Sequence, residues 1–243
     1  MISKANIKFI KSLQIKKYRK QEQCFVVEGG KSVLELLNSD FEVEMLLGTT
    51  DFLNGLKGTI KAEVHEVTAK DLTGLGEFQT NETALAVARM KENTEFTVSE
   101  DEFALVLDDM RDPGNLGTII RTADWYGIRK IVASEETADF YNSKVITSTM
   151  GSFTRTQIFY TALETYLSGS RHPILGAFLD GQDVHQFKFG KGGLIVIGNE
   201  ARGISPSIEK FITTRITIPR YGQAESLNAA IATAIICDNL RRG

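Results

Sequence analysis

The sequence predicts an α/β protein in two parts, a small amino-terminal α/β domain and a larger carboxy-terminal domain built on a parallel sheet. Short apolar runs alternate with helical stretches along the whole chain, as strand–helix units require. In the carboxy-terminal part these runs are apolar throughout, which is typical of parallel strands buried on both faces. A polar, acidic stretch separates the parts and indicates a linker. The predicted organisation is therefore a domain over 1–90, a linker over 91–102 and a domain over 103–243.

The elements follow from local pattern. In the amino-terminal part the expected helices cover 7–18 and 32–37, and the expected strands cover 25–28 and 43–47. A short element near 64–67 and an apolar stretch over 83–88 follow them. In the carboxy-terminal part the expected strands cover 104–107, 130–133, 157–159, 174–179, 194–197 and 215–218. Open parallel sheets bind ligands at the carboxyl ends of their strands, so the segments that follow these strands are the first candidates for a site.

Composition narrows the class of protein. The chain has 243 residues and a net charge of −3, with no apolar run near the roughly 20 residues of a membrane span. Two cysteines, Cys24 and Cys237, cannot build a disulfide framework and suggest a reducing compartment. The three histidines, His65, His172 and His185, lie far apart without metal-ligand spacing. With a charged amino terminus that lacks the pattern of a secretory signal, we expect a cytoplasmic protein with no metal site and no membrane partner.

The first twenty residues are strongly basic although the whole chain is acidic. They contain no acid and seven cations, which are Lys4, Lys8, Lys11, Lys16, Lys17, Arg19 and Lys20. Such a segment can attract phosphate groups locally. A solvated helix face would have the same composition, and both interpretations stay open.

Three segments carry candidate chemistry, and the first is DDMRDPGNLGTIIRTADWYG over 108–127. A Pro-Gly-Asn turn precedes a helix for which Asn115 is the expected N-cap and Gly127 the residue just past the end. Arg121 lies about one and a half turns beyond Asn115. An ordinary strand–turn–helix with a surface arginine would look the same.

The second segment is GNEARG over 198–203, where a strand ends in an open Gly-Asn-Glu turn. Gly198 would let a ligand approach the backbone closely. Ser205 and Pro206 are typical of the N-cap and first position of a helix. Glu200 is a candidate functional acid, although a carboxylate near a helix start can also be purely structural.

The third segment is IPRYGQAESLN over 218–228, which precedes a helix. Pro219 ends the strand, and Ser226 is the expected cap. Residues 229–237 are apolar or small on every face, so this helix is either a central core helix or one side of a subunit interface. Because all three segments leave strands at their carboxyl ends, we expect their polar side chains to share one edge of the sheet: Asn115, Arg121, Glu200, Ser226 and Asn228.

Two other motifs are excluded. The sequence EGGKS over 28–32 follows a strand and precedes a helix, as a phosphate-binding P-loop does. That motif needs a further glycine where this chain has Phe25, which argues against a nucleotide hydrolase acting through Lys31. A Gly-x-Gly-x-x-Gly dinucleotide fingerprint follows none of the predicted strands.

In this order and spacing the three segments resemble the motifs of the SpoU (TrmH-like) family of RNA ribose 2′-O-methyltransferases. The matching residues are Asn115, Gly117 and Arg121 in the first motif, Gly198, Glu200 and Gly203 in the second, and Ile218, Pro219, Ser226, Leu227 and Asn228 in the third. The segment FVVEGGKSVLELL, over 25–37, looks more loosely like the substrate-binding domain common in this family.

The resemblance implies a trefoil-knotted carboxy-terminal domain, a homodimer and S-adenosylmethionine as the methyl donor. It places the cofactor against Gly198, Ile218, Ser226 and Leu227. It places the chemistry at Asn115, Arg121, Glu200 and Asn228, with Arg121 acting on the RNA and Glu200 orienting it or accepting a proton. The two-domain form favours ribosomal RNA over transfer RNA. The alternatives are a tRNA 2′-O-methyltransferase, methylation at another RNA atom, and a non-catalytic RNA-binding protein of the same fold.

Overall fold

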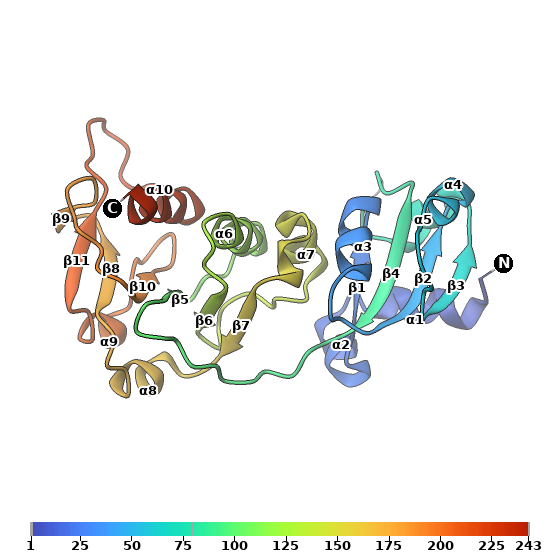
Figure 1. Cartoon of the computed structure of the whole chain (residues 1–243), viewed down its shortest axis with the longest axis horizontal. Coiled ribbons are helices and arrows are strands. Elements are labelled where there is room, and N and C mark those ends of the chain that lie inside the picture. Colours follow the sequence, from blue (N-terminus) through green and yellow to red (C-terminus); the bar gives the residue numbers. More distant parts are fainter. Residues whose placement is uncertain (1, 79, 243) are drawn as a thin grey trace. The chain divides into compact units, whose positions relative to one another are not determined.

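The computed structural model describes residues 2–78 and 80–242, which form two compact units (Figure 1). Unit 1 contains Met1–Glu92 and Asp139–Thr154, and unit 2 contains Asn93–Ala138 and Arg155–Gly243. The predicted boundaries differ from this division at 139–154. That segment packs with unit 1 because its helix α7 (Ser143–Thr149) lies against strand β1 (Cys24–Glu28) and the Phe153 ring stands edge-on to the Phe25 ring at 6.1 Å.

Unit 1 is built on a four-stranded sheet with the order β1-β4-β2-β3. The other strands are β2 (Val43–Gly48), β3 (Glu63–Glu66) and β4 (Ala84–Arg89). Only β2 and β3 run parallel, and β4 pairs antiparallel with both β1 and β2. The two strands expected in the amino-terminal part are present as β1 and β2, and the short element near 64–67 and the apolar stretch over 83–88 are the strands β3 and β4. Side chains of the sheet pack into apolar layers. One layer contains Ile10, Val26, Leu47 and Leu72.

The helices of unit 1 differ from the prediction at two places. The single helix expected over 7–18 is two helices, α1 (Lys4–Ser12) and α2 (Lys16–Glu22), because Ile15 between them has an extended backbone. The helix α3 (Gly30–Leu37) is as expected, whereas α4 (Thr50–Asn54) and α5 (Ala69–Leu75) were not predicted. Both are short, and each is preceded by a threonine, Thr49 or Thr68, whose side chain caps the first turn.

Arg19 does not belong to the basic surface that the sequence suggested. Its side chain is 2% exposed and donates to the carbonyls of Leu13 and Gln14 at 2.9 Å each. It also forms an ion pair with Asp139 at 2.7 Å. A buried, paired arginine holds structure together, so the exposed basic residues of this segment are the lysines Lys4, Lys8, Lys11, Lys16, Lys17 and Lys20.

Unit 2 is built on a seven-stranded sheet with the order β7-β6-β5-β10-β8-β11-β9, and every strand pair is parallel. The strands are β5 (Phe103–Leu107), β6 (Lys130–Ala133), β7 (Gln157–Tyr160), β8 (Ile174–Phe178), β9 (Gln182–Asp183), β10 (Gly193–Ile197) and β11 (Thr214–Thr217). The predicted parallel sheet is confirmed, and only β9 was not expected. After β5 the chain forms β6 and β7 on one side of that strand, and the later strands β8 to β11 lie on its other side. The boundary between β5 and β10 is therefore a topological switch point.

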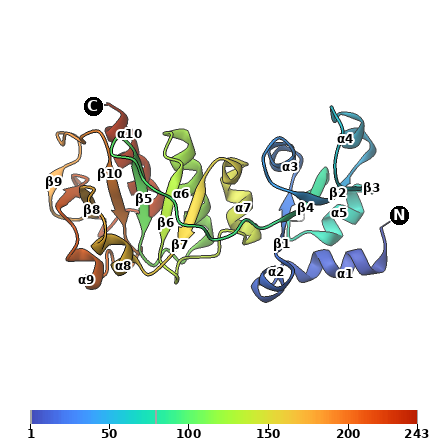
Figure 2. The same cartoon turned by 60° about the horizontal axis from the view of Figure 1, so that its bottom comes forward.

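Helices cover both faces of this sheet (Figure 2). Helices α6 (Pro113–Trp125) and α10 (Ala229–Arg242) pack on each other over one face, and the short helices α8 (Leu163–Ser168) and α9 (Pro206–Glu209) lie over the other. One side of α10 is core, with Thr233 and Ile236 almost completely buried. Its other side leaves Ile231 53% exposed. Within this chain α10 is therefore a core helix on one face only.

Candidate functional site

The loops after β5, β10 and β11 meet through a chain of hydrogen bonds between three of the predicted site residues. The Asn115 amide donates to a Glu200 carboxylate oxygen at 2.6 Å. The Asn228 amide donates to the Asn115 carbonyl oxygen at 2.9 Å. The Asn228 carbonyl oxygen in turn accepts from the backbone N–H of Ala230, at the start of α10. The structure thus brings together Asn115, Glu200 and Asn228, as the positions of their loops predicted.

In this network the side-chain amides of Asn115 and Asn228 each donate one hydrogen bond and accept at least one. The Asn115 amide donates to Glu200 through its N–H and accepts from Asn228 through its oxygen. It therefore holds these two side chains in place and does not present a free amide. The bond to Glu200 involves a carboxylate, which makes it stronger than a bond between neutral groups. Glu200 is half-buried, and its second carboxylate oxygen has no hydrogen-bond donor among residues 2–78 and 80–242. One oxygen of Glu200 is therefore fixed and the other is available.

Two capping predictions were wrong. Asn115 does not cap α6, because Asp112 accepts from the Asn115 backbone N–H at 2.7 Å and Pro113 occupies the first position of the helix. Ser226 does not cap α10, because Asn228 stands directly before the helix and accepts from its first turn. Gly127, just past the end of α6, has the expected positive φ of 69°.

The glycines of the loop at 198–203 serve the loop itself. Asn199 and Gly203 form an antiparallel bridge with N–H···O distances of 3.0 and 2.8 Å. A Cβ on Gly198 would lie 2.2 Å from the Gly203 carbonyl carbon. The space that a side chain at Gly198 would need is thus filled by the chain's own backbone, and the loop itself requires a glycine there. Gly203 has φ +70°, a left-handed conformation that glycine adopts without strain.

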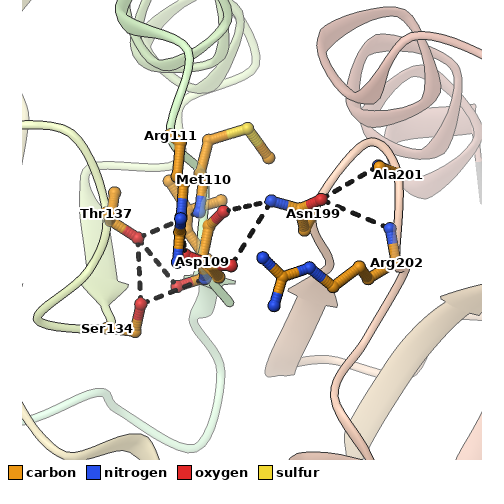
Figure 3. A network of polar contacts seen from close by, with 9 residues as sticks. Asp109, Met110, Arg111, Ser134, Thr137, Asn199, Ala201 and Arg202 are labelled. Carbon is orange, nitrogen blue, oxygen red and sulfur yellow. Dashed lines mark hydrogen bonds and ion pairs between the residues drawn. The ribbon is translucent and has the colours of Figure 1, made fainter.

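A second network fixes the loop after β5, and its residues were not predicted as part of the site (Figure 3). Asn199 donates to the Asp109 carbonyl at 2.8 Å and accepts from the backbone of Ala201 at 2.9 Å. The Asp109 N–H donates to the Ser134 hydroxyl at 3.0 Å, and the Met110 N–H donates to the Thr137 hydroxyl at 3.2 Å. Asp109 has φ +56°, which is uncommon for a residue with a side chain. The tertiary hydrogen bonds hold that conformation.

Asp108 adds a second tie between the same two loops. Its carboxylate is 6% exposed and accepts from the Ser205 backbone N–H at 2.7 Å. The sequence carried a signal for these residues that was not used. Asp108 and Asp109 end a buried strand, and Asn199 lies between two predicted site residues. Polar residues at the carboxyl ends of parallel strands are where a site is expected.

The other predicted residues are not joined to this network. Arg121 is exposed, and its side chain makes no hydrogen bond or ion pair with any residue in the described ranges, so Glu200 does not orient Arg121 in this structure. Ser226 and Leu227 are exposed, and their backbone groups bond to nothing in the described part of the chain. Ile218 lines a hollow of about 400 Å³ together with His185 and residues of α10.

Residues 2–78 and 80–242 contain no cluster of three or more histidine, cysteine or acidic side chains that could hold a metal ion. None of the helices found in those ranges has the length and apolar character to cross a membrane.

A parallel sheet with a polar network at its switch point defines a ligand-binding α/β enzyme fold, and comparison with known proteins identifies the class. Residues 102–238 match the SpoU rRNA Methylase family, and residues 4–86 match the MRM3-like substrate binding domain. The chain belongs to the SpoU rRNA methylase family, as its three motifs predicted.

Particular relatives resemble the whole chain. The 23S rRNA (guanosine(2553)-2′-O)-methyltransferase RlmP of Bacillus subtilis is 31% identical over 241 residues, which are 97% of this chain and 95% of that protein. A solved protein from Porphyromonas gingivalis, assigned to the TrmH family of RNA methyltransferases, is 38% identical with a TM-score of 0.90, and the match covers 100% of both chains. The SpoU methyltransferase AviRb from Streptomyces viridochromogenes, solved with AdoMet, is 25% identical with a TM-score of 0.88, covering 99% of this chain and 98% of that one.

Proposed function

We propose that this protein methylates a ribose 2′-hydroxyl of ribosomal RNA, with S-adenosylmethionine as methyl donor. It is an S-adenosylmethionine-dependent RNA 2′-O-methyltransferase of the SpoU family. The observation that carries the proposal is the Asn228–Asn115–Glu200 network, which joins the three family motifs at the switch point of the sheet. Ribosomal RNA is favoured because RlmP, similar along nearly its whole length, is a 23S rRNA methyltransferase. A tRNA substrate is the second candidate.

The residues present fit the cofactor. The third-motif loop offers unbonded backbone groups at Ser226 and Leu227, and Leu227 adds an apolar side chain that is 46% exposed. Backbone N–H and C=O groups suit the polar edges of an adenine, and an apolar side chain suits its face. We place the cofactor against this loop, with Gly198 and Ile218 contributing from the ends of β10 and β11. When bound, S-adenosylmethionine supplies an electrophilic methyl group on sulfonium sulfur.

The chain's own residues must position and activate the ribose. Transfer of the methyl group to the ribose 2′-oxygen would release the hydroxyl proton and leave S-adenosylhomocysteine, so the chain's residues would have to place the 2′-oxygen and take up that proton. A neutral hydroxyl is a weak nucleophile, so a proton acceptor or a cation near the oxygen helps. The available oxygen of Glu200 can accept that proton. Arg121, exposed and unpaired in the described chain, can hold the neighbouring phosphate and stabilise negative charge on oxygen.

The test is a pair of arginine variants. Arg121→Ala should reduce single-turnover transfer of labelled methyl to 23S rRNA by about 10², the effect of removing one preorganised transition-state donor. Calorimetric affinity for S-adenosylmethionine should stay within a few-fold. Arg121→Lys should rescue poorly, because an ammonium lacks the planar fork that grips phosphate.

Arg171→Ala is the matched control, because Arg171 is also exposed but lies before β8, at the amino-terminal edge of the sheet. Its transfer rate should equal that of the wild type. A wild-type rate in Arg121→Ala would remove the residue from the mechanism. Loss of cofactor affinity in that variant would move Arg121 to the cofactor pocket.

We further propose that unit 1 binds the RNA substrate, supported by its match to a substrate-binding domain and by its exposed lysines. Replacing Lys16, Lys17 and Lys20 by glutamine should make RNA affinity less dependent on salt, and the logarithmic slope should fall by about one for each phosphate that the variant no longer neutralises. Arg19 is left unchanged because it is buried and paired. An unaltered slope would leave these lysines as an ordinary solvated surface.

The remaining expectations concern assembly. We propose a homodimer through the outer face of α10, where Ile231 is 53% exposed, and a trefoil knot in unit 2, as in the family. Light scattering at micromolar concentration tests the dimer, and the mass of a monomer would exclude it.

A further inference from the structure

Trp125 is the single tryptophan of the sequence, and its side chain is 83% exposed at the end of α6. The backbone around it is firmly held. Asp124 forms an ion pair with Arg155 at 3.0 Å, and the Tyr126 carbonyl accepts from Arg241 Nε at 2.6 Å. Both neighbours of Trp125 are anchored to other elements of unit 2. The indole therefore stands outward on a fixed helix end, and its exposure does not result from fraying.

An exposed indole contributes less to stability than a packed one. A tryptophan buries more apolar area than any other residue when it is packed, so an exposed one forgoes a large stabilisation. Trp125 has no ring–ring or cation–ring contact with the residues in the described ranges. An aromatic ring kept rigid, flat and uncovered is the usual form of a platform on which a nucleic-acid base stacks.

The surroundings of Trp125 suit a nucleic-acid strand. Arg121 lies one turn before it, so the two side chains share one exposed face of α6. Arg129, four residues after Trp125, is also exposed, and its side chain has no hydrogen-bond or ion-pair partner in the part of the chain that is described. Each of the two arginines can take a phosphate, with the indole between them in sequence.

The same helix connects this surface to the candidate site. Asn115 lies in the first turn of α6 and Trp125 is its last residue. Ten residues of α-helix rise about 15 Å, so an RNA strand whose ribose lies near Asn115 can reach Trp125. Arg121 lies between them along the helix, so a strand that runs from the candidate site to Trp125 passes Arg121.

We infer that Trp125 stacks on an unpaired base of the substrate RNA, a few nucleotides from the one that is methylated, while Arg121 and Arg129 hold the flanking phosphates. This inference rests on the proposed function and adds a residue that selects single-stranded over double-stranded RNA. Trp125 contributes to substrate binding and has no part in methyl transfer itself. Stacking accepts any base, so the residue selects an unpaired strand and not a sequence.

The experiment uses the tryptophan as its own reporter. A short single-stranded RNA should quench the fluorescence of the wild-type chain, because direct stacking on a base quenches indole emission, and the matched duplex should quench much less. Trp125→Ala should weaken binding of the single strand about tenfold, corresponding to about 1.4 kcal/mol, within the range measured for one stacked base. Trp125→Phe, which keeps an aromatic face, should recover most of that affinity.

Kinetics separate this role from catalysis. With 23S rRNA as substrate, Trp125→Ala should raise KM about tenfold while kcat and the calorimetric affinity for S-adenosylmethionine stay at wild-type values. A fall in kcat at unchanged KM would overturn the inference. Quenching by duplex equal to that by single strand would also overturn it.

Two further outcomes distinguish the possible errors. If the free wild-type protein shows the blue emission of a buried indole and shifts to red on dilution, a second copy of the chain covers Trp125 and the inference is wrong. If the wild type methylates 23S rRNA but RNA leaves the fluorescence unchanged, the inference fails and the proposed function stands. Absence of methyl transfer by the wild type to both ribosomal and transfer RNA would instead overturn the proposed function.

Discussion

Substitution of Gly198 by alanine tests how the second-motif loop is built. The added Cβ would lie 2.2 Å from the carbonyl carbon and 2.4 Å from the carbonyl oxygen of Gly203, and 2.3 Å from the Ile204 nitrogen. All three are backbone atoms, so no side chain can swing away. The loop would have to recede by about 1 Å to reach ordinary van der Waals contact.

The size of the effect follows from what that movement breaks. The two strands of the loop are joined by two backbone hydrogen bonds between Asn199 and Gly203. Their loss costs about 0.5–1.5 kcal/mol each, and overpacking costs a further 1–3 kcal/mol. We expect Gly198→Ala to destabilise unit 2 by about 2–6 kcal/mol and to weaken S-adenosylmethionine binding at least tenfold, because the displaced loop lies at the switch point.

Gly203→Ala is the matched control in the same loop. A Cβ there meets nothing within 4 Å, and only the backbone conformation, with φ +70°, opposes it. A side chain in the left-handed region costs about 1–2 kcal/mol. Urea unfolding and calorimetry with S-adenosylmethionine should therefore rank Gly198→Ala as the more damaging variant. Wild-type stability in Gly198→Ala, or the reverse ranking, would refute the steric explanation.

Three further predictions concern other residues. Burial raises the pKa of Glu28 above 4.5, so the folded state favours the protonated carboxyl, and its contribution to stability is lost as pH rises through the folded pKa. In urea unfolding, the stability of the wild type relative to Glu28→Gln should therefore be greater at pH 4 than at pH 7. A difference that does not change with pH would contradict this prediction. Asn228→Ala should cost about 1–2 kcal/mol of stability, because it removes the cap of α10 and the hydrogen bond to Asn115. Asn228→Ser keeps a capping side chain and should recover about half of that loss. Equal unfolding midpoints for the wild type and Asn228→Ala would show that the cap is unimportant. Burial raises the pKa of Cys237 to about 12, so this thiol should resist a disulfide reagent in the folded protein at pH 8 and react in urea.

Sequence pattern was a good guide where local signals decide the structure. The central strands β5 and β10 of unit 2 are short runs of buried residues, and their apolar composition alone located them. Because the strands of unit 2 are parallel, the sequence also predicted that Asn115, Glu200 and Asn228 would share an edge. Periodicity does not give strand order, so the placement of β10 between β5 and β8 required the structure.

The predictions from sequence were wrong where distant contacts or competing local signals determine the structure. The segment 139–154 packs with unit 1 because Tyr141 and Phe153 contact Phe25, more than a hundred residues earlier, and no local pattern records that contact. Asp112 and Asn115 are equally good capping types, but Pro113 at the first helical position favours Asp112, a rule that could have been applied to the sequence.

The polar groups of the site fall into two kinds, and the division predicts how variants will behave. Asn115 and Asn199 have both ends of their amides engaged in hydrogen bonds across loops, so they maintain the geometry. Arg121, Trp125 and the second oxygen of Glu200 have no hydrogen-bond or ion-pair partner among the described residues and are the groups left to meet a substrate. Loss of an engaged group must disturb stability and activity together, because its partners are left unpaired. Loss of a free group should change activity or RNA affinity at nearly constant stability, since folding does not depend on interactions that the protein alone does not make.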